Sequence, residues 1–433
     1  MNRYVCVHGH FYQPPRENPW LHEIERQESA YPFHDWNERI TAECYAPNAV
    51  SRILDDERHI VAIRNNYVRM SFNYGPTLLS WLQKKQPKVY QAILRADQQS
   101  IERCSGHGSA LAQVYNHVIL PLANARDQRT QVRWGIADFE HRFGRRPEGM
   151  WLAETAVDLE SLAVLAEHGI RFTVLAPHQA GRVRGIGGAA WRGVEVGRVD
   201  TRRPYRVELR DGLEIAVFFY DGQLSRAVAF DKLLENGEQF AKALLGGFED
   251  GREGPQLVNL ATDGETFGHH HPHGDMALAF CLDHIESKGL AKLTNYGEFL
   301  ALHPPTHEVE LVPNTSWSCS HGIERWRSDC GCHTGSEPGW NQRWRAPLRE
   351  ALDWLRDALA ARCEQRLALH VHDPWAVRDA AIALDLDASQ QAQDRFFEAH
   401  AREALDEQER ATVLKLLELQ RHAMLMYLSL IHI

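Results

Sequence analysis

Apolar positions follow two periods along the chain up to about residue 300, and together they predict strands and helices in turn. Short β-branched or aromatic runs begin near residues 4, 68, 149, 172, 215 and 257. Stretches with apolar residues at helical spacing separate these runs. Strands that alternate with helices predict a parallel sheet, and the number of units favours a barrel over a small doubly wound sheet.

Three amphipathic stretches illustrate the helical part of this pattern. The clearest runs from Asp158 to His168. We expect Asp158 to act as its N-cap and Gly169 to follow its last turn, because these residue types favour those positions. Residues 131–143 and 275–287 show the same spacing and are also expected to be helices.

The pattern changes at the Pro-rich stretch 303–313, where the alternation ends. We therefore expect a catalytic (β/α)-type barrel over residues 1–310 and a Cys/Trp-rich loop over the barrel mouth at 311–345. Residues 346–433 are rich in helix formers and predict a helical appendage. Its end, LSLIHI, has neither a cap nor a polar tail, so we expect a truncated fragment.

Charge and composition narrow the function classes. The 48 Lys and Arg residues against 58 Asp and Glu give a formal net charge of -10, which disfavours nucleic acid and anionic membranes as partners. No signal-peptide core or membrane span is evident, so we expect a cytoplasmic protein with a neutral partner. We therefore expect no structural disulfides among the 8 cysteines, and no cofactor.

Polar side chains follow the first predicted strand in VHGHFYQPPRE. His8 and His10 are two residues apart, so on an extended strand both project from one face, and Gln13 follows them. Ligand sites in parallel α/β folds lie at the carboxyl ends of the strands. These residues are candidates for substrate binding, with hydrogen-bonded core histidines as the alternative.

A single carboxylate follows the strand predicted at residues 149–153. Glu154 ends this strand, and Trp151 within it offers a ring face to a sugar. Glu154 could instead cap the next helix or pair with an arginine. Asp158 already serves as the expected cap, so we favour a position for Glu154 at the barrel mouth.

Another apolar strand ends at Asp263 in LVNLATDGETFGHHHPHGD, with Glu265 and His269 close behind. An Asp-Gly turn explains Asp263 and Gly264 but leaves the histidine run unexplained. Metal binding is the rival function, because carboxylates and imidazoles are zinc ligands. Paired carboxyl groups from two strands also suit glycosidic bond cleavage, in which one attacks the anomeric carbon and the other donates a proton to the leaving oxygen.

Four segments in this order and spacing resemble the motifs of glycoside hydrolase family 57. They are HGHFYQP, which has two residues inserted before Gln13, GHGSALAQVYNHVILPL around His107 and His117, GRRPEGMWLAE ending in Glu154, and ATDGETFGHHH. The resemblance covers about 300 residues. It implies a (β/α)7 barrel, Glu154 as nucleophile and Asp263 as proton donor, acting with retention on α-linked glucans or maltooligosaccharides. We add His107 to the expected substrate-binding residues.

The loop SWSCSHGIERWRSDCGCHTG contains Cys319, Cys330, Cys332 and His333, with His321 between them. Thiols and imidazoles this close could form a structural zinc site, although the spacing matches no familiar zinc-finger pattern. The alternative is a reduced, rigid loop that packs over the barrel mouth and offers Trp317, Arg325 or Trp326 to the substrate.

Three functions remain open on the sequence. The favoured one is an amylase-like hydrolase or a glucanotransferase or branching enzyme, which share the first half-reaction. For a retaining mechanism we expect the Glu154 and Asp263 carboxyls about 5 to 5.5 Å apart, with no catalytic metal in the barrel. The second is a metal-dependent carbohydrate deacetylase that would use His8, His10 and the run 269–273. The third is a glucan-binding protein without activity.

Overall fold

The computed structural model describes residues 2–21, 23–188, 190–332, 337 and 339–432, and its contacts divide the chain into two compact units. The first unit comprises Met1–Ala112, Pro147–Trp151 and Gly169–Val312. The second comprises Gln113–Arg146, Leu152–His168 and Pro313–Ile433. Each unit therefore combines segments that are distant in sequence.

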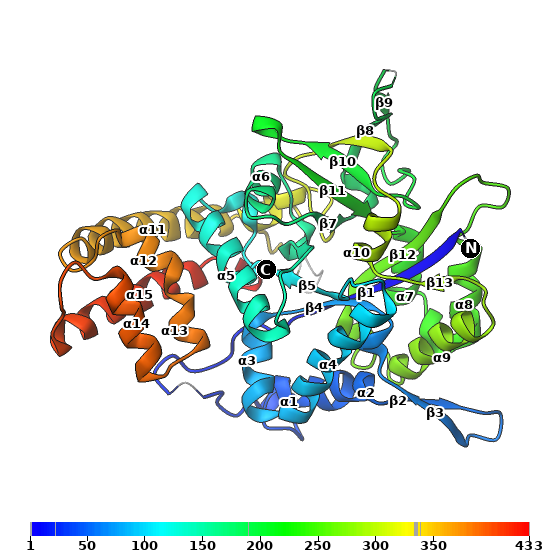
Figure 1. The fold of residues 1–433 in the computed structure, drawn as a ribbon, viewed down its shortest axis with the longest axis horizontal. Helices are drawn as coiled ribbons and strands as arrows, with labels where there is room; N and C mark the ends of the chain where they lie inside the picture. The colour runs from blue at the N-terminus through cyan, green and yellow to red at the C-terminus, as the bar shows by residue number, and fades with distance from the viewer. Residues whose placement is uncertain (1, 22, 189, 333–336, 338, 433) are drawn as a thin grey trace. The chain divides into compact units, whose positions relative to one another are not determined.

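The first unit is built on parallel strands (Figure 1). In sheet order they run β12, β1, β4, β5 and β6, a bridge between Gly149 and Phe172 leads from β6 to β7, and β7 pairs in parallel with β11. The Asp221 amide donates to the Asn259 carbonyl at 2.8 Å, which links the end of β11 to β12. The barrel strands are β1 (Arg3–Phe11), β4 (Ser71–Tyr74), β5 (Ala110–Gln113), β6 (Met150–Trp151), β7 (Phe172–Leu175), β11 (Glu214–Phe219) and β12 (Gln256–Asp263).

The barrel strands are buried on both faces because both faces are covered. In β12 every residue except Asp263 is buried, and in β1 all but the first are. Such continuous burial is typical of parallel sheets that carry helices outside and a packed interior. The predicted α/β fold with a (β/α)7-type barrel is confirmed, as is the end of a strand at Asp263.

Helices connect the barrel strands within the first unit. Proline at the first turn begins α3 and α4, and the Asp221 and Asn236 side chains cap α7 and α8. The predicted helix 275–287 is confirmed as α9. The helices are α1 (Trp36–Ile40), α2 (Ala46–Ala49), α3 (Pro76–Lys85), α4 (Pro87–Arg103), α7 (Gly222–Phe230), α8 (Gly237–Gly246), α9 (Gly274–Ser287) and α10 (Tyr296–Leu302).

Further strands of the first unit were not predicted from the sequence. From β11 the second sheet continues through β10, β14, β8 and β9, and a separate hairpin pairs β2 with β3. The stretch taken as a boundary at 303–313 therefore contains strand β14, which pairs with β8 and β10. These strands are β2 (Ser51–Leu54), β3 (Ile60–Arg64), β8 (Ala180–Gly185), β9 (Arg192–Gly193), β10 (Tyr205–Glu208), β13 (Lys292–Leu293), which pairs with β1, and β14 (His307–Leu311).

The second unit is helical. Asp158 caps α6 by accepting from the Ser161 amide, and Gly169 follows with φ 81°, so both predicted ends of this helix are confirmed. The predicted helix 131–143 lies within α5. The helices are α5 (Ala125–Phe143), α6 (Leu159–Glu167), α11 (Arg345–Leu367), α12 (Pro374–Ala380), α13 (Ile382–Leu386), α14 (Gln390–His400) and α15 (Glu407–Leu425).

The C-terminal helices of the second unit have their own core. It contains Cys363, Val377, Phe396, Phe397 and Leu417, contributed by four of the helices. The predicted helical C-terminal region is therefore confirmed as a packed structure. Within the described residues, no helix combines the length and apolar character that a membrane span needs.

Candidate active site

Strand β1 carries His8 and His10 on one face, as predicted, and both side chains are buried. Asn73 of β4 joins them, because its Oδ1 lies 3.1 Å from His8 Nε2 and its Nδ2 lies 2.9 Å from His10 Nδ1. Ser71 Oγ lies 3.0 Å from the other His8 ring nitrogen. Both ring nitrogens of His8 are thus occupied by the protein, which fits a supporting role for this residue.

Burial lowers the pKa of both imidazoles to about 3. For His8 the neighbouring His10 lowers the pKa further, while the Asn73 hydrogen bond opposes the shift at both residues. Both side chains are therefore neutral at physiological pH. A pair of neutral imidazoles offers hydrogen bonds without charge, which suits a neutral ligand.

Trp151 of β6 stacks on both histidines. Its ring lies 4.8 Å from that of His8 and 5.1 Å from that of His10, with interplanar angles of 19° and 20°. The side chain is fully buried. Trp151 therefore fixes the two imidazoles, and its predicted contact with a sugar ring stays a prediction.

Asp263 is exposed at the last position of β12, where it pairs in register with His10 of β1. Paired residues on neighbouring strands project from the same face, so Asp263 and His10 share one side of the sheet. Burial, followed by the charge of Asp263, raises the pKa of the nearby Tyr220. The exposed carboxyl thus lies at the carboxyl edge of the barrel beside buried polar groups.

Glu265 lies two residues beyond Asp263 and is buried, with 5% of its surface exposed. Its Oε1 accepts from the Tyr45 hydroxyl at 2.5 Å and from the Tyr12 amide at 3.2 Å. Burial raises its pKa to about 8, the Tyr45 hydrogen bond opposes this, and the charge of Asp263 adds to the increase. Glu265 is therefore protonated at neutral pH and is held by protein groups.

This shift predicts that Glu265 contributes a fall in the free energy of unfolding as the pH rises from about 6.5 to 8. In that window Glu265 is ionised in the unfolded chain but protonated in the folded one, so the folded state binds more protons. The slope reaches at most about 1.4 kcal/mol per pH unit. Denaturant unfolding at several pH values should show it in the wild type and lose it in Glu265→Gln. The exposed Glu102→Gln is the control and should keep the slope; an unchanged slope in Glu265→Gln would contradict the assignment.

Two other predicted residues of the first unit have protein partners. Gln13 Oε1 accepts from Arg16 at 2.8 Å. His269 Nδ1 pairs with Glu43, and its ring meets that of Trp36 edge-on at 5.9 Å. Both residues follow barrel strands, and their roles in substrate binding stay predictions.

Glu154 belongs to the second unit and differs locally from the prediction. Strand β6 already ends at Trp151, and Glu154 lies in the 3-10 turn η5 (Ala153–Thr155) with φ 57°. Thr155 also has positive φ, at 49°. Left-handed backbone at a non-glycine residue costs about 1 to 3 kcal/mol and often marks a functional position.

Trp317 holds the strained turn through both its backbone and its side chain. Its amide donates to the Glu154 carbonyl at 3.0 Å, and its indole Nε1 donates to Glu154 Oε2 at 3.1 Å. The indole thereby occupies one carboxylate oxygen and orients the other. Trp317 was predicted as a substrate-binding residue from the loop; its observed contact is with the predicted nucleophile.

His107 lies at a different edge of the barrel from the other predicted residues. It precedes β5, and its Nδ1 lies 2.9 Å from Oε1 of Glu148, which precedes β6. Arg171 pairs with the same Glu148 at 2.8 Å. These are the amino ends of the strands, so the structure does not bring His107 together with His8 and His10.

The zinc candidates Cys319, Cys330 and Cys332 come together in the second unit, and His321 joins them. The predicted fourth ligand, His333, lies outside the described residues.

Sequence reasoning missed several residues of the site. Asn73, Tyr45 and Tyr12 bond to predicted residues, yet only Asn73, a polar residue inside a fully buried strand, carries a signal of its own. Tyr45 lies 220 residues from its partner Glu265 along the chain. Contacts of this kind follow from the fold and not from local sequence.

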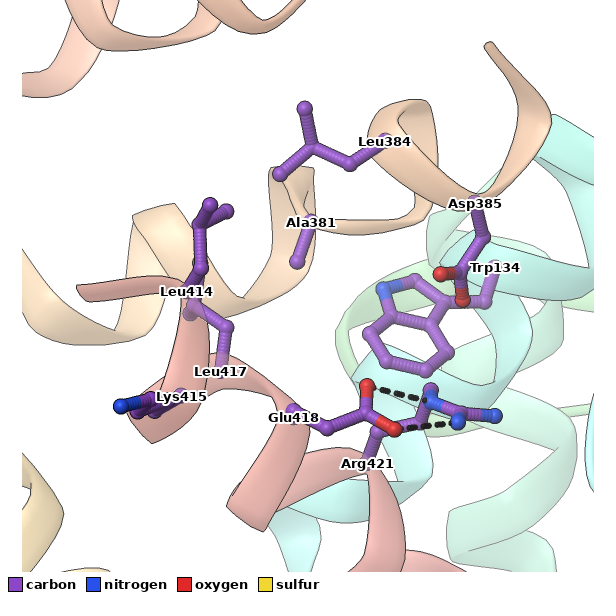
Figure 2. A pocket seen from close by; sticks show the side chains of 9 residues that line it. All are labelled: Trp134, Ala381, Leu384, Asp385, Leu414, Lys415, Leu417, Glu418 and Arg421. Atoms are coloured by element: carbon purple, nitrogen blue, oxygen red, sulfur yellow. Dashed lines mark hydrogen bonds and ion pairs between the residues drawn. The ribbon is translucent and has the colours of Figure 1, made fainter. Parts of the chain in front are cut away.

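A pocket of ≈ 290 Å³ lies among the helices of the second unit (Figure 2). One wall carries an ion pair, in which Arg421 Nε donates to Glu418 Oε2 at 2.8 Å, whereas burial raises the pKa of Asp385 and so favours its neutral form. No sequence-predicted site residue lines the pocket. Its lining residues are Trp134, Ala381, Leu384, Asp385, Leu414, Lys415, Leu417, Glu418 and Arg421.

A seven-stranded parallel barrel with carboxylates and imidazoles at its carboxyl edge defines a barrel enzyme of the glycoside hydrolase class. The family model for glycosyl hydrolase family 57 matches residues 7–312, and the chain therefore belongs to this family. The predicted family is confirmed, and the predicted enzyme class agrees with it. A second family model, a domain of unknown function (DUF3536), matches residues 340–430.

Comparison with single proteins gives distant similarities. Alpha-amylase 1 of Dictyoglomus thermophilum is 28% identical over 107 residues, which are 24% of this chain and 15% of that protein. An exo-type maltose-forming amylase from Pyrococcus sp. ST04 has a TM-score of 0.72 at 16% identity, covering 100% of this chain and 76% of that chain. A family 57 branching enzyme from Thermococcus kodakaraensis has a TM-score of 0.57 at 17% identity, covering 100% and 89%. At these identities the two structures establish the fold.

Proposed function

We propose that this protein is a retaining enzyme that cleaves or transfers α-linked glucans, with Glu154 as nucleophile and Asp263 as general acid/base. The observation that carries the proposal is the position of the two carboxylates in the chain. Asp263 is the last residue of β12, and Glu154 comes three residues after the end of β6. The carboxyl ends of barrel strands form the active face in enzymes of this architecture.

In the first step, the Glu154 carboxylate attacks the anomeric carbon while the Asp263 carboxyl donates its proton to the leaving glycosidic oxygen. The carbon–oxygen bond to the leaving glucan breaks, and an ester to Glu154 forms. The Trp317 indole, which donates to Glu154 Oε2, positions the other oxygen for attack. The left-handed turn at Glu154 supports this role, because strained backbone at a non-glycine residue often marks a functional position.

In the second step, Asp263 removes a proton from an acceptor hydroxyl, which attacks the same carbon and releases Glu154. Water as acceptor gives hydrolysis, and a glucan hydroxyl gives transfer. The similar structures include both an amylase and a branching enzyme, so both outcomes belong to the proposal. His10, Gln13 and His269 complete the proposed substrate site on the first unit, and His8 supports His10 through their shared partner Asn73.

The deacetylase alternative requires a metal held by His8, His10 and nearby groups. Within the described residues, the ligand atoms that lie close enough to share an ion belong to Cys319, His321, Cys330 and Cys332. His8, His10 and Asp263 do not form such a group. The glycosidase proposal therefore has the better support.

Retention predicts that the first product formed from a maltooligosaccharide is the α-anomer. Two displacements at one carbon restore its configuration, and this geometry requires the Glu154 and Asp263 carboxyls about 5 to 5.5 Å apart. Proton NMR of the anomeric signals, recorded before mutarotation, checks the stereochemistry. Chromatography of the same mixture separates hydrolysis, which yields shorter products alone, from transfer, which also yields longer ones.

Two outcomes of this experiment would contradict the proposal. Early accumulation of the β-anomer would indicate inversion. Binding of the oligosaccharide without any turnover would indicate a glucan-binding protein without activity. A Glu154→Gln preparation purified in the same way controls for contaminating amylase.

A further inference from the structure

The Cys-containing loop of the second unit is anchored at both of its sides. The Asn314 amide donates to the Val157 carbonyl at 2.8 Å, and the Ile323 amide donates to the Asn314 carbonyl at 3.0 Å. Between them, Gly322 has φ 62° and lies so close to Asn314 that a Cβ would meet its carbonyl oxygen at 2.0 Å. The loop therefore requires glycine at this position and returns tightly on itself.

An apolar cluster packs against the same loop. Ile323 and Trp326 of η10 (Gly322–Trp326) are buried against Ala153 and Ala156. The Trp326 indole also donates to the Ser429 carbonyl at 3.1 Å. Packing of this kind fixes the backbone from which the thiols project.

Three thiols and one imidazole of this loop converge. Cys319 Sγ lies 3.7 Å from Cys332 Sγ, and His321 Nδ1 lies 3.8 Å from the first sulfur and 3.5 Å from the second. Cys330 completes the group, and its four ligand atoms all lie within 4.8 Å of one another. All of these cysteines are free thiols.

These separations fit one tetrahedral zinc ion. Bonds of about 2.3 Å to sulfur and about 2.0 to 2.1 Å to nitrogen, at tetrahedral angles, place two sulfurs about 3.8 Å apart and sulfur and nitrogen about 3.6 Å apart. The observed distances of 3.7, 3.8 and 3.5 Å agree with these values. No backbone movement is needed for the measured pairs to share an ion.

Two of the sulfurs accept hydrogen bonds from the protein. The His321 amide donates to Cys319 Sγ at 3.4 Å, and Arg345 Nη1 donates to Cys330 Sγ at 3.8 Å. Arg345 is buried, with 2% of its surface exposed, and no carboxylate among the described residues forms an ion pair with it. A buried cation needs a compensating charge. Three thiolates with one Zn²⁺ carry a net charge of -1, which balances this guanidinium.

We propose that Cys319, His321, Cys330 and Cys332 bind a structural Zn²⁺ ion, with His321 coordinating through Nδ1. Four protein ligands close the coordination sphere, as in structural rather than catalytic zinc sites. The ligands follow the sequence pattern C-x-H-x8-C-x-C, and His321 is the histidine of the described residues that lies within reach of the sulfurs.

The zinc ion would brace the segment that carries Trp317, two residues before Cys319. Trp317 in turn holds the turn at Glu154 through its amide and its indole. This consequence rests on the proposed function, because it matters for turnover only if Glu154 is catalytic. The metal content itself does not depend on that function.

The test uses the full chain without a histidine tag, purified from zinc-supplemented medium. Mass spectrometry of the metals should find about one zinc per chain. Replacement by Co²⁺ should give the intense visible bands of a tetrahedral site and thiolate-to-cobalt absorption. Chelation should lower the thermal midpoint, and added zinc should restore it. Wild-type protein that takes up no zinc, or a disulfide between Cys319 and Cys332 in freshly purified protein, would overturn the proposal.

Variants identify the ligands. His321→Ala and Cys319→Ser should lower zinc below about a tenth of an ion per chain, because loss of one of four ligands opens the site. Cys363→Ser is the matched control; it changes a buried thiol in the helical core and should retain zinc. If His321→Ala retains the metal while His333→Ala loses it, the ligand set is wrong. If Cys319→Ser fails to fold, the cobalt spectrum of the wild type still decides.

Metal content and turnover separate this proposal from the proposed function. Zinc at full occupancy in a protein that does not act on glucans would leave the metal site standing and contradict the enzyme. A zinc-free protein with normal turnover and retention would support the proposed enzyme and overturn the metal site. Loss of zinc with a fall in kcat and a largely unchanged KM would support the brace on Trp317.

Discussion

Replacing Glu154 by Gln should lower kcat on maltooligosaccharides by about 10³-fold or more, with little change in the thermal midpoint. The amide is a poor nucleophile, so no glycosyl-enzyme forms. Its size matches that of the carboxylate, and its oxygen can still accept from the Trp317 indole, which lies 3.1 Å from Glu154 Oε2. Initial rates, together with a melting curve, measure both effects.

Glu160→Gln is the matched control for this variant. It makes the same chemical change in the first turn of α6, within the same unit, and outside the proposed machinery. Its turnover should equal that of the wild type. Turnover of Glu154→Gln within a few-fold of that value would remove Glu154 as the nucleophile.

The helical cap and the strand ends were predictable because they depend on local sequence. Asp158 and Gly169 border α6 as expected, and β12 ends at Asp263, where an apolar run meets an Asp-Gly turn. The turn at Glu154 was not predictable, because glycine or asparagine usually signals left-handed backbone and this position has neither. The contacts of Trp317, made across 163 residues, provide the reason for this conformation.

The polar partners of the site could not be predicted for a related reason. The sequence predicts an accessible carboxylate at Glu265, beside Asp263. In the structure Glu265 is buried and accepts hydrogen bonds from the Tyr45 hydroxyl and the Tyr12 amide. His107 lies within a segment that resembles a family motif. It comes before strand β5, so it lies at the amino ends of the strands with Glu148. Residue type identified these positions, and only the fold determined their partners.

The metal site shows the same limit at shorter range. The sequence offered both His321 and His333 near the three cysteines. The sequence prediction took His333 as the fourth ligand, although no familiar spacing supported this choice. The structure brings His321 Nδ1 within 3.8 Å of Cys319 Sγ and 3.5 Å of Cys332 Sγ, a proximity that the spacing along the sequence does not reveal.

Replacing Asp263 by Asn should lower kcat on a glucan by about 10² to 10⁴-fold. The first step should stay fast on substrates whose leaving group needs no proton. A glucan leaves as an alkoxide unless it is protonated, whereas fluoride leaves as a stable anion. An α-maltotriosyl fluoride should therefore still form the glycosyl-enzyme in the variant. The ester should then accumulate, because the asparagine cannot activate water, and mass spectrometry of the protein should detect it on Glu154.

Azide makes the assignment of Asp263 specific. It is an anion that attacks without a general base, so it should restore turnover of the fluoride by Asp263→Asn and yield the α-configured glycosyl azide by a second displacement. Asp283→Asn, which changes an aspartate of α9 paired with Arg64, should behave as the wild type with and without azide. Equal losses on glucan and fluoride, with no azide product, would show that Asp263 acts on structure or binding. An acid/base residue transfers a proton in each of the two steps. A fluoride leaving group removes the need for the first proton transfer, and azide removes the need for the second. Restored turnover with both therefore identifies Asp263 as the acid/base residue.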